Sequence, residues 1–199
     1  MCSVLSHSDE FLITGTYDRL INVIRIETGD LVHSVEKHFD AITALAISLD
    51  DNILVSASID KSVKRWSFDD MQVIDSISNI YSPVTSMVIT CDNTFVIIGC
   101  ENNTVQIKSL ITGSDVHELN GHNSTITSIA VSSDCERIYV ACSDSKLYLY
   151  DIRSKELIAV LIEQESSIND LKISVDNSFL FSSSGVIKQK FILFFHAKY

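Results

Sequence analysis

The feature of this sequence that most limits its possible folds is a repeat of 42 residues. Ile42–Phe68 (ITALAISLDDNILVSASIDKSVKRWSF) and Ile126–Ile152 (ITSIAVSSDCERIYVACSDSKLYLYDI) lie 84 residues apart, twice this period, and Val84–Leu110 lies midway between them. Partial copies begin at Phe11 and Ile168. Two series of turn residues keep the same spacing: Asp50, Asp92, Asp134 and Asp176, and Asp18, Asp60, Asn102 and Asp144. Such a period indicates a repeat architecture, in which each copy is one supersecondary unit.

Each copy has the pattern of short β-strands. In the copy that begins at Ile42 we expect four strands, over Ala44–Ser48, Ile53–Ser58, Val63–Phe68 and Gln72–Ser78. They are rich in β-branched and aromatic residues and are bounded by Asp, Asn and Ser, which make turns through side-chain hydrogen bonds to the backbone. No segment keeps a helical period over 11 or more residues. The sequence therefore predicts an all-β fold of four-stranded antiparallel units.

A four-stranded unit of this length resembles the WD-repeat (WD40) β-propeller family. The best-formed blades of that family hold a hydrogen-bonded set of His, Ser or Thr, Asp and Trp. In the second copy the corresponding residues are His38, Ser56, Asp60 and Trp66. The resemblance implies that the histidine donates to the aspartate and that the serine hydroxyl lies between the histidine and the tryptophan N–H.

The other copies keep less of this set. In the fourth copy the resemblance assigns His122, Asp144 and Tyr150 to it, with Val140 in place of the hydroxyl residue. The first copy keeps Thr14 and Asp18. The third copy has four other residues at these positions: Ile80, Ile98, Asn102 and Lys108.

The resemblance implies a partial, open propeller of about 4.7 repeats. We expect one WD-repeat domain over residues 1–199, with an incomplete first blade at 1–42 and three blades at 43–84, 85–126 and 127–168. The start of a fifth blade follows at 169–185. Residues 186–199 form a divergent tail, which is either a hydrophobic docking segment or, as we favour, sequence unrelated to the repeat.

No catalytic site is predicted. His38, Asp60 and Ser56 are residue types of a hydrolase triad, but they are also the structural set of the family, and we favour that role. The sequence contains no P-loop, GxGxxG, GxSxG or HExxH motif and no CxxC pair. We therefore expect no enzyme activity, no cofactor, no metal and no small-molecule substrate.

Charge and hydropathy narrow the choice of partner and location. The net charge of −11 disfavours nucleic acid. No apolar run reaches the roughly 18–20 residues that would span a membrane. Without a secretory signal, we expect an intracellular protein, cytoplasmic or nuclear, whose five cysteines are reduced thiols.

Protein or peptide binding is the expected function, and the resemblance implies that partners dock on one loop face. Four side chains expected there directly precede a turn Asp or Asn, and a fifth, Tyr81, lies nearby: Tyr17, Ile59, Glu101, Ser143 and Tyr81. The protein would then be an interaction scaffold.

Two other roles remain open at this stage. Tyr150-Asp151-Ile152-Arg153 resembles the Trp-Asp-x-Arg motif by which some WD-repeat proteins dock on a cullin ubiquitin-ligase adaptor, with Asp151 and Arg153 matching. WD arrays also serve as regulatory or sensor segments of larger nucleotide-hydrolysing signalling proteins.

Overall fold

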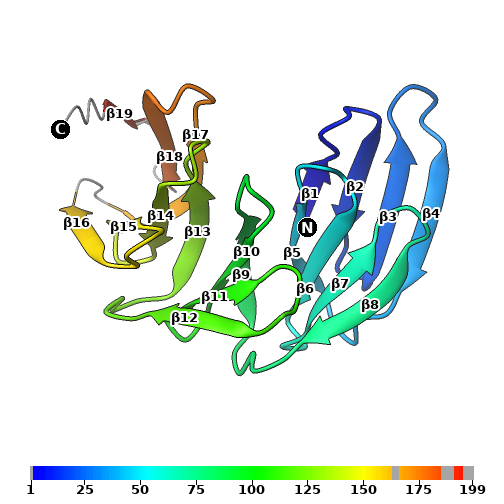
Figure 1. The fold of residues 1–199 in the computed structure, drawn as a ribbon, viewed down its shortest axis with the longest axis horizontal. Helices are drawn as coiled ribbons and strands as arrows, with labels where there is room; N and C mark the ends of the chain where they lie inside the picture. The colour runs from blue at the N-terminus through cyan, green and yellow to red at the C-terminus, as the bar shows by residue number, and fades with distance from the viewer. Residues whose placement is uncertain (1, 163–165, 185–190, 195–199) are drawn as a thin grey trace.

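In the computed structural model, which describes residues 2–162, 166–184 and 191–194, the chain forms five successive β-sheets (Figure 1). The first sheet contains β1 (Cys2–Leu5), β2 (Phe11–Gly15), β3 (Leu20–Arg25) and β4 (Leu31–Glu36), and the second contains β5 (Ile42–Ile47), β6 (Ile53–Ser58), β7 (Val63–Ser67) and β8 (Gln72–Ile77). The third contains β9 (Val84–Ile89), β10 (Phe95–Cys100), β11 (Val105–Ser109) and β12 (Asp115–Leu119). The fourth contains β13 (Ile126–Val131), β14 (Arg137–Cys142), β15 (Lys146–Asp151) and β16 (Leu157–Ile162), and the fifth contains β17 (Ile168–Ile173), β18 (Phe179–Ser184) and β19 (Phe191–Phe194).

Within every sheet, strands that are consecutive in the chain pair with each other, and all of these pairs are antiparallel. The second strand of a sheet, such as β6, is buried on both faces because it lies between two neighbouring sheets. The fourth strand, such as β8, alternates between covered and exposed residues as expected at an edge. The all-β prediction is confirmed, and the four strands expected in the second copy end within two residues of the observed ones.

The hydrophobic core consists of layers between neighbouring sheets. Ile13 and Ile21 of the first sheet pack with Leu54 and Trp66 of the second. The opposite face of the second sheet packs on the third through another set of buried residues: Ala44, Val55, Ala57, Val84 and Ile98. The first strands of adjacent sheets contact one another from β1 to β17, so they form the inner side of the array.

A buried arginine joins the second sheet to the third. Arg65 on β7 donates its guanidinium hydrogens to the backbone carbonyls of Leu110 and Ile111, which follow β11. The same side chain pairs with Asp75 on β8, with Nε 2.7 Å from Oδ1. These contacts satisfy a charge that would otherwise be costly to bury.

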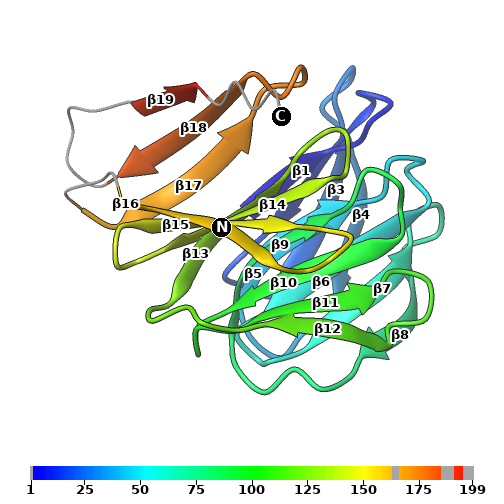
Figure 2. The same ribbon diagram turned by 60° about the vertical axis from the view of Figure 1, so that its left-hand side comes forward.

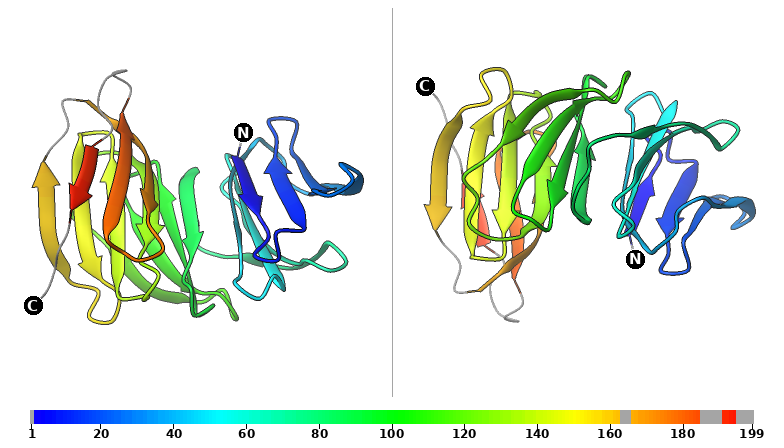
Figure 3. Two further views of the ribbon diagram at one scale, coloured as in Figure 1. Left: turned by 90° about the horizontal axis from the view of Figure 1, so that it is seen from above. Right: turned by 90° about the horizontal axis from the view of Figure 1, so that it is seen from below.

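The five sheets are arranged as an open fan. Figure 3 shows the first and the last sheets at opposite ends of the arc, and Figure 2 shows successive sheets stacked side by side. The expected partial, open propeller of four-stranded blades is therefore confirmed over the described residues. The division of the chain at residues 43, 85, 127 and 169 stays a prediction. In the region expected as a divergent tail, Phe191–Phe194 forms β19 beside β18, whereas 186–190 and 195–199 lie outside the described residues.

The expectation of five reduced thiols is wrong for one pair. Cys91 and Cys135 form a disulfide between the third and fourth sheets, with Cα atoms 6.0 Å apart, and Cys2, Cys100 and Cys142 are free. The two residues are 44 positions apart, and the same separation joins Leu49 N–H to Asn93 Oδ1 and Ser133 N–H to Asn177 Oδ1, each at 2.8 Å. Turns of adjacent sheets thus meet at residues that are 44 positions apart, the repeat period plus two.

The described part of the chain includes no helix with the length and apolar character needed to cross a membrane.

Candidate functional site

The polar set of the second sheet is assembled from three elements. His38 lies between β4 and β5, Ser56 is on β6, and Trp66 is on β7. His38 Nε2 lies 2.6 Å from Ser56 Oγ, and Trp66 Nε1 donates to the same oxygen at 2.8 Å. Ser56 Oγ thus bonds to the tryptophan and to the imidazole at the same time. The structure therefore brings these three predicted residues together.

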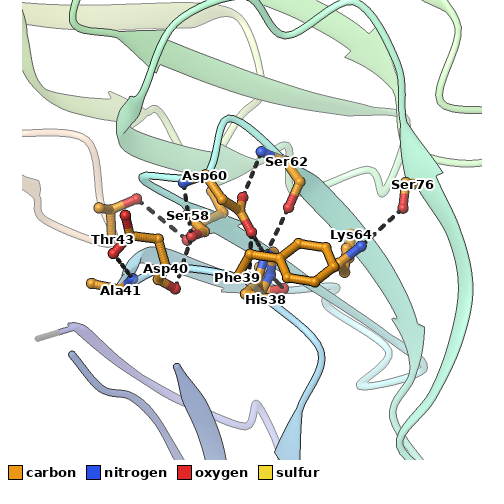
Figure 4. Close-up of polar contacts among 12 residues, drawn as sticks. His38, Phe39, Asp40, Ala41, Thr43, Ser58, Asp60, Ser62, Lys64 and Ser76 are labelled. Carbon is orange, nitrogen blue, oxygen red and sulfur yellow. Dashed lines mark hydrogen bonds and ion pairs between the residues drawn. The ribbon is translucent and has the colours of Figure 1, made fainter. Parts of the chain in front are cut away.

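Asp60 completes the set from the turn between β6 and β7 (Figure 4). Its Oδ2 accepts the Phe39 N–H at 2.7 Å and lies 3.4 Å from His38 Nδ1. Its Oδ1 accepts the Ser62 N–H at 2.8 Å, and Ser62 Oγ lies 2.8 Å from His38 Nδ1. The oxygen nearest to His38 Nδ1 is thus the Ser62 hydroxyl, not the Asp60 carboxylate.

Sequence reasoning missed Ser62, although a signal was present. The third copy has Thr104 at the same position, two residues after its turn asparagine, and the Thr104 hydroxyl donates to Asn102 Oδ1 at 2.8 Å. A hydroxyl residue two positions after a turn Asp or Asn is a common way to close such a turn. Comparing the copies at that offset would have found it.

Burial and hydrogen bonding set the charges in this set. Burial lowers the pKa of His38, against the opposing effect of Asp60, so the imidazole is neutral near pH 7. Burial by itself raises the pKa of the Asp60 carboxyl, but hydrogen bonds from Ser62 and the Phe39 N–H outweigh it and hold that pKa below its usual value. Ser56 is 0% exposed, so a substrate has no access to its hydroxyl. The arrangement is suited to stabilising a turn rather than to nucleophilic attack.

The fourth sheet joins its predicted residues only in part. Tyr150 OH lies 2.9 Å from His122 Nε2, and the His122 ring packs edge-on against Tyr148 with centroids 4.7 Å apart. His122 Nδ1 and Asp144 Oδ2 have no hydrogen-bond partner among the described residues, so the expected bond between them is absent. Val140 stands in the serine position, and the tyrosine hydroxyl bonds to the imidazole directly.

The third sheet replaces the set with an ion pair between a buried lysine and an exposed aspartate. Lys108 stands where the second sheet has Trp66 and is fully buried. Its ammonium group donates to the Ser78 carbonyl at 2.9 Å and pairs with Asp115 on β12. Asp115 Oδ2 also accepts the Asn79 amide at 2.7 Å. Ile80 and Ile98 fill the positions of the histidine and the serine.

Beside this ion pair lies a hollow of about 280 Å³ that the sequence did not predict. Seven residues line it: Asn79, Tyr81, Gln106, Asp115, Val116, His117 and Glu118. The Gln106 side chain is buried, and its Oε1 has no hydrogen-bond partner among the described residues. An orphaned buried acceptor of this kind costs about 1–3 kcal/mol.

The side chains predicted for partner binding lie in turns. Tyr17, Ile59, Glu101 and Ser143 occupy equivalent turns between the second and third strands of four sheets, and Tyr81 precedes β9. All five are exposed, with Tyr17 at 70%, Tyr81 at 74% and Ile59 at 41%.

Asp151 and Arg153 are at the other end of their sheet, in the turn between β15 and β16. Asp151 Oδ1 accepts the Arg153 N–H at 2.9 Å and the Ser154 N–H at 2.8 Å. Asp151 thus closes its own turn, and the pair does not join the face that carries Tyr17.

No group of three or more potential metal ligands occurs in the part of the chain that the structure describes. Burial raises the pKa of the free thiol of Cys100 and raises that of Cys142 to about 12. Because the thiolate is the nucleophile, these two cysteines are poor nucleophiles.

Two regions of the chain match the family model "WD domain, G-beta repeat": residues 29–67 and 112–151. The first contains the whole set from His38 to Trp66, and the second contains His122, Asp144 and Tyr150. The matches thus fall on the two copies in which sequence comparison placed most of the polar set. No curated protein matches the chain significantly.

Proposed function

The chain is built from WD repeats, and from that premise we propose that it is a non-enzymatic scaffold that binds a protein or peptide on the face carrying Tyr17, Ile59 and Tyr81. WD repeats form propeller domains that generally bind proteins or peptides. The proposal goes further and names the side chains that make the contact.

The observation that carries the proposal is the exposure of these three side chains in turns. Tyr17 and Tyr81 are each at least 70% exposed, so covering their rings with a partner stabilises the complex. Aromatic side chains of this kind contribute much of the binding energy in many interfaces. Ile59 adds an aliphatic contact in the turn that follows β6. These residues belong to three different connections, so one extended peptide across the loops is a suitable ligand.

The buried set of the second sheet supports a binding role over a catalytic one. Ser56 has no exposed surface, and its oxygen already accepts the Trp66 N–H. A nucleophile needs a free approach to its substrate. The residues that resemble a triad are therefore assigned to turn stabilisation.

The test is a selection of displayed peptides on the protein, followed by affinity measurement with labelled peptide. We expect the triple variant Tyr17→Ala, Ile59→Ala, Tyr81→Ala to bind the selected peptides at least about tenfold more weakly, because each anchor loss costs about 1 kcal/mol or more.

The matched control is Val175→Ala, which removes an exposed aliphatic side chain from the turn between β17 and β18. Its affinity should equal that of the unaltered protein. Peptides that bind the triple variant as tightly as the original chain would refute the assigned face.

A further inference from the structure

The hollow on the third sheet (Asn79, Tyr81, Gln106, Asp115, Val116, His117 and Glu118) lies where the fourth sheet carries a larger side chain. Gln106 on β11 pairs with Ile98 on β10, and Tyr148 on β15 pairs with Val140 on β14 at the equivalent place. In the fourth sheet the Tyr148 ring is buried against His122. A glutamine is shorter than a tyrosine, so the third sheet leaves space there.

The hollow is lined by a buried amide whose oxygen has no partner among the described residues. Gln106 is 8% exposed, and its amide oxygen Oε1 is enclosed without a hydrogen-bond partner among the described residues. Buried polar atoms of folded proteins are almost always paired. Gln106 therefore makes one wall of the hollow polar.

The walls of the hollow are acidic and aromatic. Asp115 and Glu118 extend from β12, which forms the outer edge of the third sheet (Figure 2). The charge of Asp115 is balanced by Lys108, so Glu118, for which no described residue supplies an ion pair, leaves one negative charge unbalanced. Tyr81 contributes an exposed ring whose hydroxyl bonds to Asn79 Oδ1 at 3.1 Å.

We propose that this hollow binds an arginine side chain of a partner peptide. A guanidinium group offers several N–H donors in one plane, which suits the exposed Glu118 carboxylate, and it stacks on aromatic rings such as that of Tyr81. The compact, strongly hydrated ammonium group of lysine fits such a site less well. The net charge of −11 attracts basic peptides to the protein.

This inference rests on the proposed function, since Tyr81 belongs both to the binding face and to the hollow. It adds the chemistry of one peptide side chain and four residues that sequence reasoning did not select: Gln106, Asp115, His117 and Glu118.

The experiment is a titration of the full chain, followed by NMR, with the peptide acetyl-Gly-Gly-Arg-Gly-Gly-amide and with its citrulline and lysine counterparts. Citrulline keeps the shape of arginine without its charge. We expect the arginine peptide to shift the backbone signals of Tyr81, Gln106 and Glu118. The citrulline peptide should bind at least tenfold more weakly, and the lysine peptide should fall between the two.

Two variants and one control test the geometry. Gln106→Tyr fills the hollow with the side chain that the fourth sheet carries there and should abolish the shifts. Glu118→Gln, a change on the surface, should weaken binding several-fold. Glu156→Gln, an exposed carboxylate on the connection before β16, should leave it unchanged.

Equal affinity for the arginine and citrulline peptides, or binding that survives Gln106→Tyr, would overturn the inference. Selected peptides that need Tyr17 and Ile59 but contain no essential arginine would also overturn it while leaving the proposed function intact. Arginine-dependent binding at the hollow together with selected peptides indifferent to Tyr17 and Ile59 would support the inference and reject the assigned face.

Discussion

The second and third sheets carry the same four structural positions and fill them in different ways. The second has a closed polar set, in which Ser56 joins the His38 imidazole to the Trp66 indole inside the core. The third has two isoleucines at the histidine and serine positions and a lysine that reaches outward to an edge aspartate. The difference teaches that the unit requires filled volume and paired polar atoms rather than one set of residues.

The comparison also shows where a binding site can arise. In the second sheet every polar atom of the set has a partner within the sheet or its loops. In the third sheet the Gln106 amide oxygen has no partner among the described residues, and it lies beside a hollow. Where the third sheet departs from the other copies, it therefore has a hollow and an unpaired amide oxygen.

The largest effect is expected for Trp66→Ala. The indole is fully buried between the first and second sheets, so its loss opens a cavity and removes the donor to Ser56. We expect a loss of about 3–4 kcal/mol in the free energy of unfolding, measured by urea denaturation. Asn102→Ala, at an exposed turn of the third sheet, should cost less than about 1 kcal/mol. Equal losses at the two sites would mean that the repeat register is misassigned.

Acidification should weaken the sheets that contain buried histidines. Burial lowers the pKa of His38 and of His122 below 6.5 in the folded state. At a pH between the lowered pKa and 6.5, the unfolded chain therefore binds more protons than the folded chain. The free energy of unfolding should therefore fall as the pH drops below about 6.5, by at most about 1.4 kcal/mol per pH unit for each histidine. Urea denaturation at pH 7.5 and 5.5 measures this.

His122→Gln is the comparison for this pH effect. Removing one of the two buried imidazoles should make the loss of stability between pH 7.5 and 5.5 smaller. An unchanged pH dependence in that variant would show that His122 does not contribute.

A smaller effect is expected at the junction that the third sheet makes with the fourth. Cys135 has a φ of 55° at a turn position where the other copies have Asp9, Asp51, Asn93 and Asn177, all with positive φ. Asp and Asn adopt this conformation more readily than other side chains. In reducing buffer, Cys135→Asn should raise the free energy of unfolding by about 0.5–1 kcal/mol.

In oxidising buffer the same variant lacks the link to Cys91 and should lose that advantage. Denaturation in both buffers distinguishes the two contributions, and a variant less stable than the original chain in reducing buffer would contradict the backbone argument.

The smallest effect is expected for Lys108→Met, which tests the third sheet at the position of Trp66. Methionine fills a volume similar to that of lysine. Asp115 loses its ion-pair partner in this variant, but its side chain is more than half exposed and stays hydrated. We expect a change within about 1 kcal/mol, measured by urea denaturation. A loss as large as that of Trp66→Ala would show that the ion pair, not filled volume, holds the third sheet.

Much of this fold could be predicted from the sequence because its signals are local and repeated. The alternation of apolar residues and the Asp, Asn and Ser turns specify strands such as Ile53–Ser58 within each copy. The 42-residue period then specifies which strands form one sheet. The approach of His38, Ser56 and Trp66 follows from that register.

The features that the sequence did not predict depend on contacts between copies, on a hydrogen bond that does not form, or on a space that no side chain fills. The disulfide of Cys91 with Cys135 joins turns of adjacent sheets, which the period within one sheet does not describe. The missing bond between His122 and Asp144 depends on the distance between two side chains, which the residue types alone do not give. The hollow at Gln106 is a space, and only packing shows that no neighbour fills it.

The most direct test of the account is hydrogen–deuterium exchange of the full chain with and without a selected peptide. Binding should slow exchange in the segments around Tyr17, Ile59 and Tyr81 and along β12, and should leave exchange at Ser56 and Trp66 on β6 and β7 unchanged. Slowed exchange centred on Ser56 and Trp66, with none around Tyr81 or β12, would contradict the claim that the buried polar set stabilises the fold while the exposed loops bind.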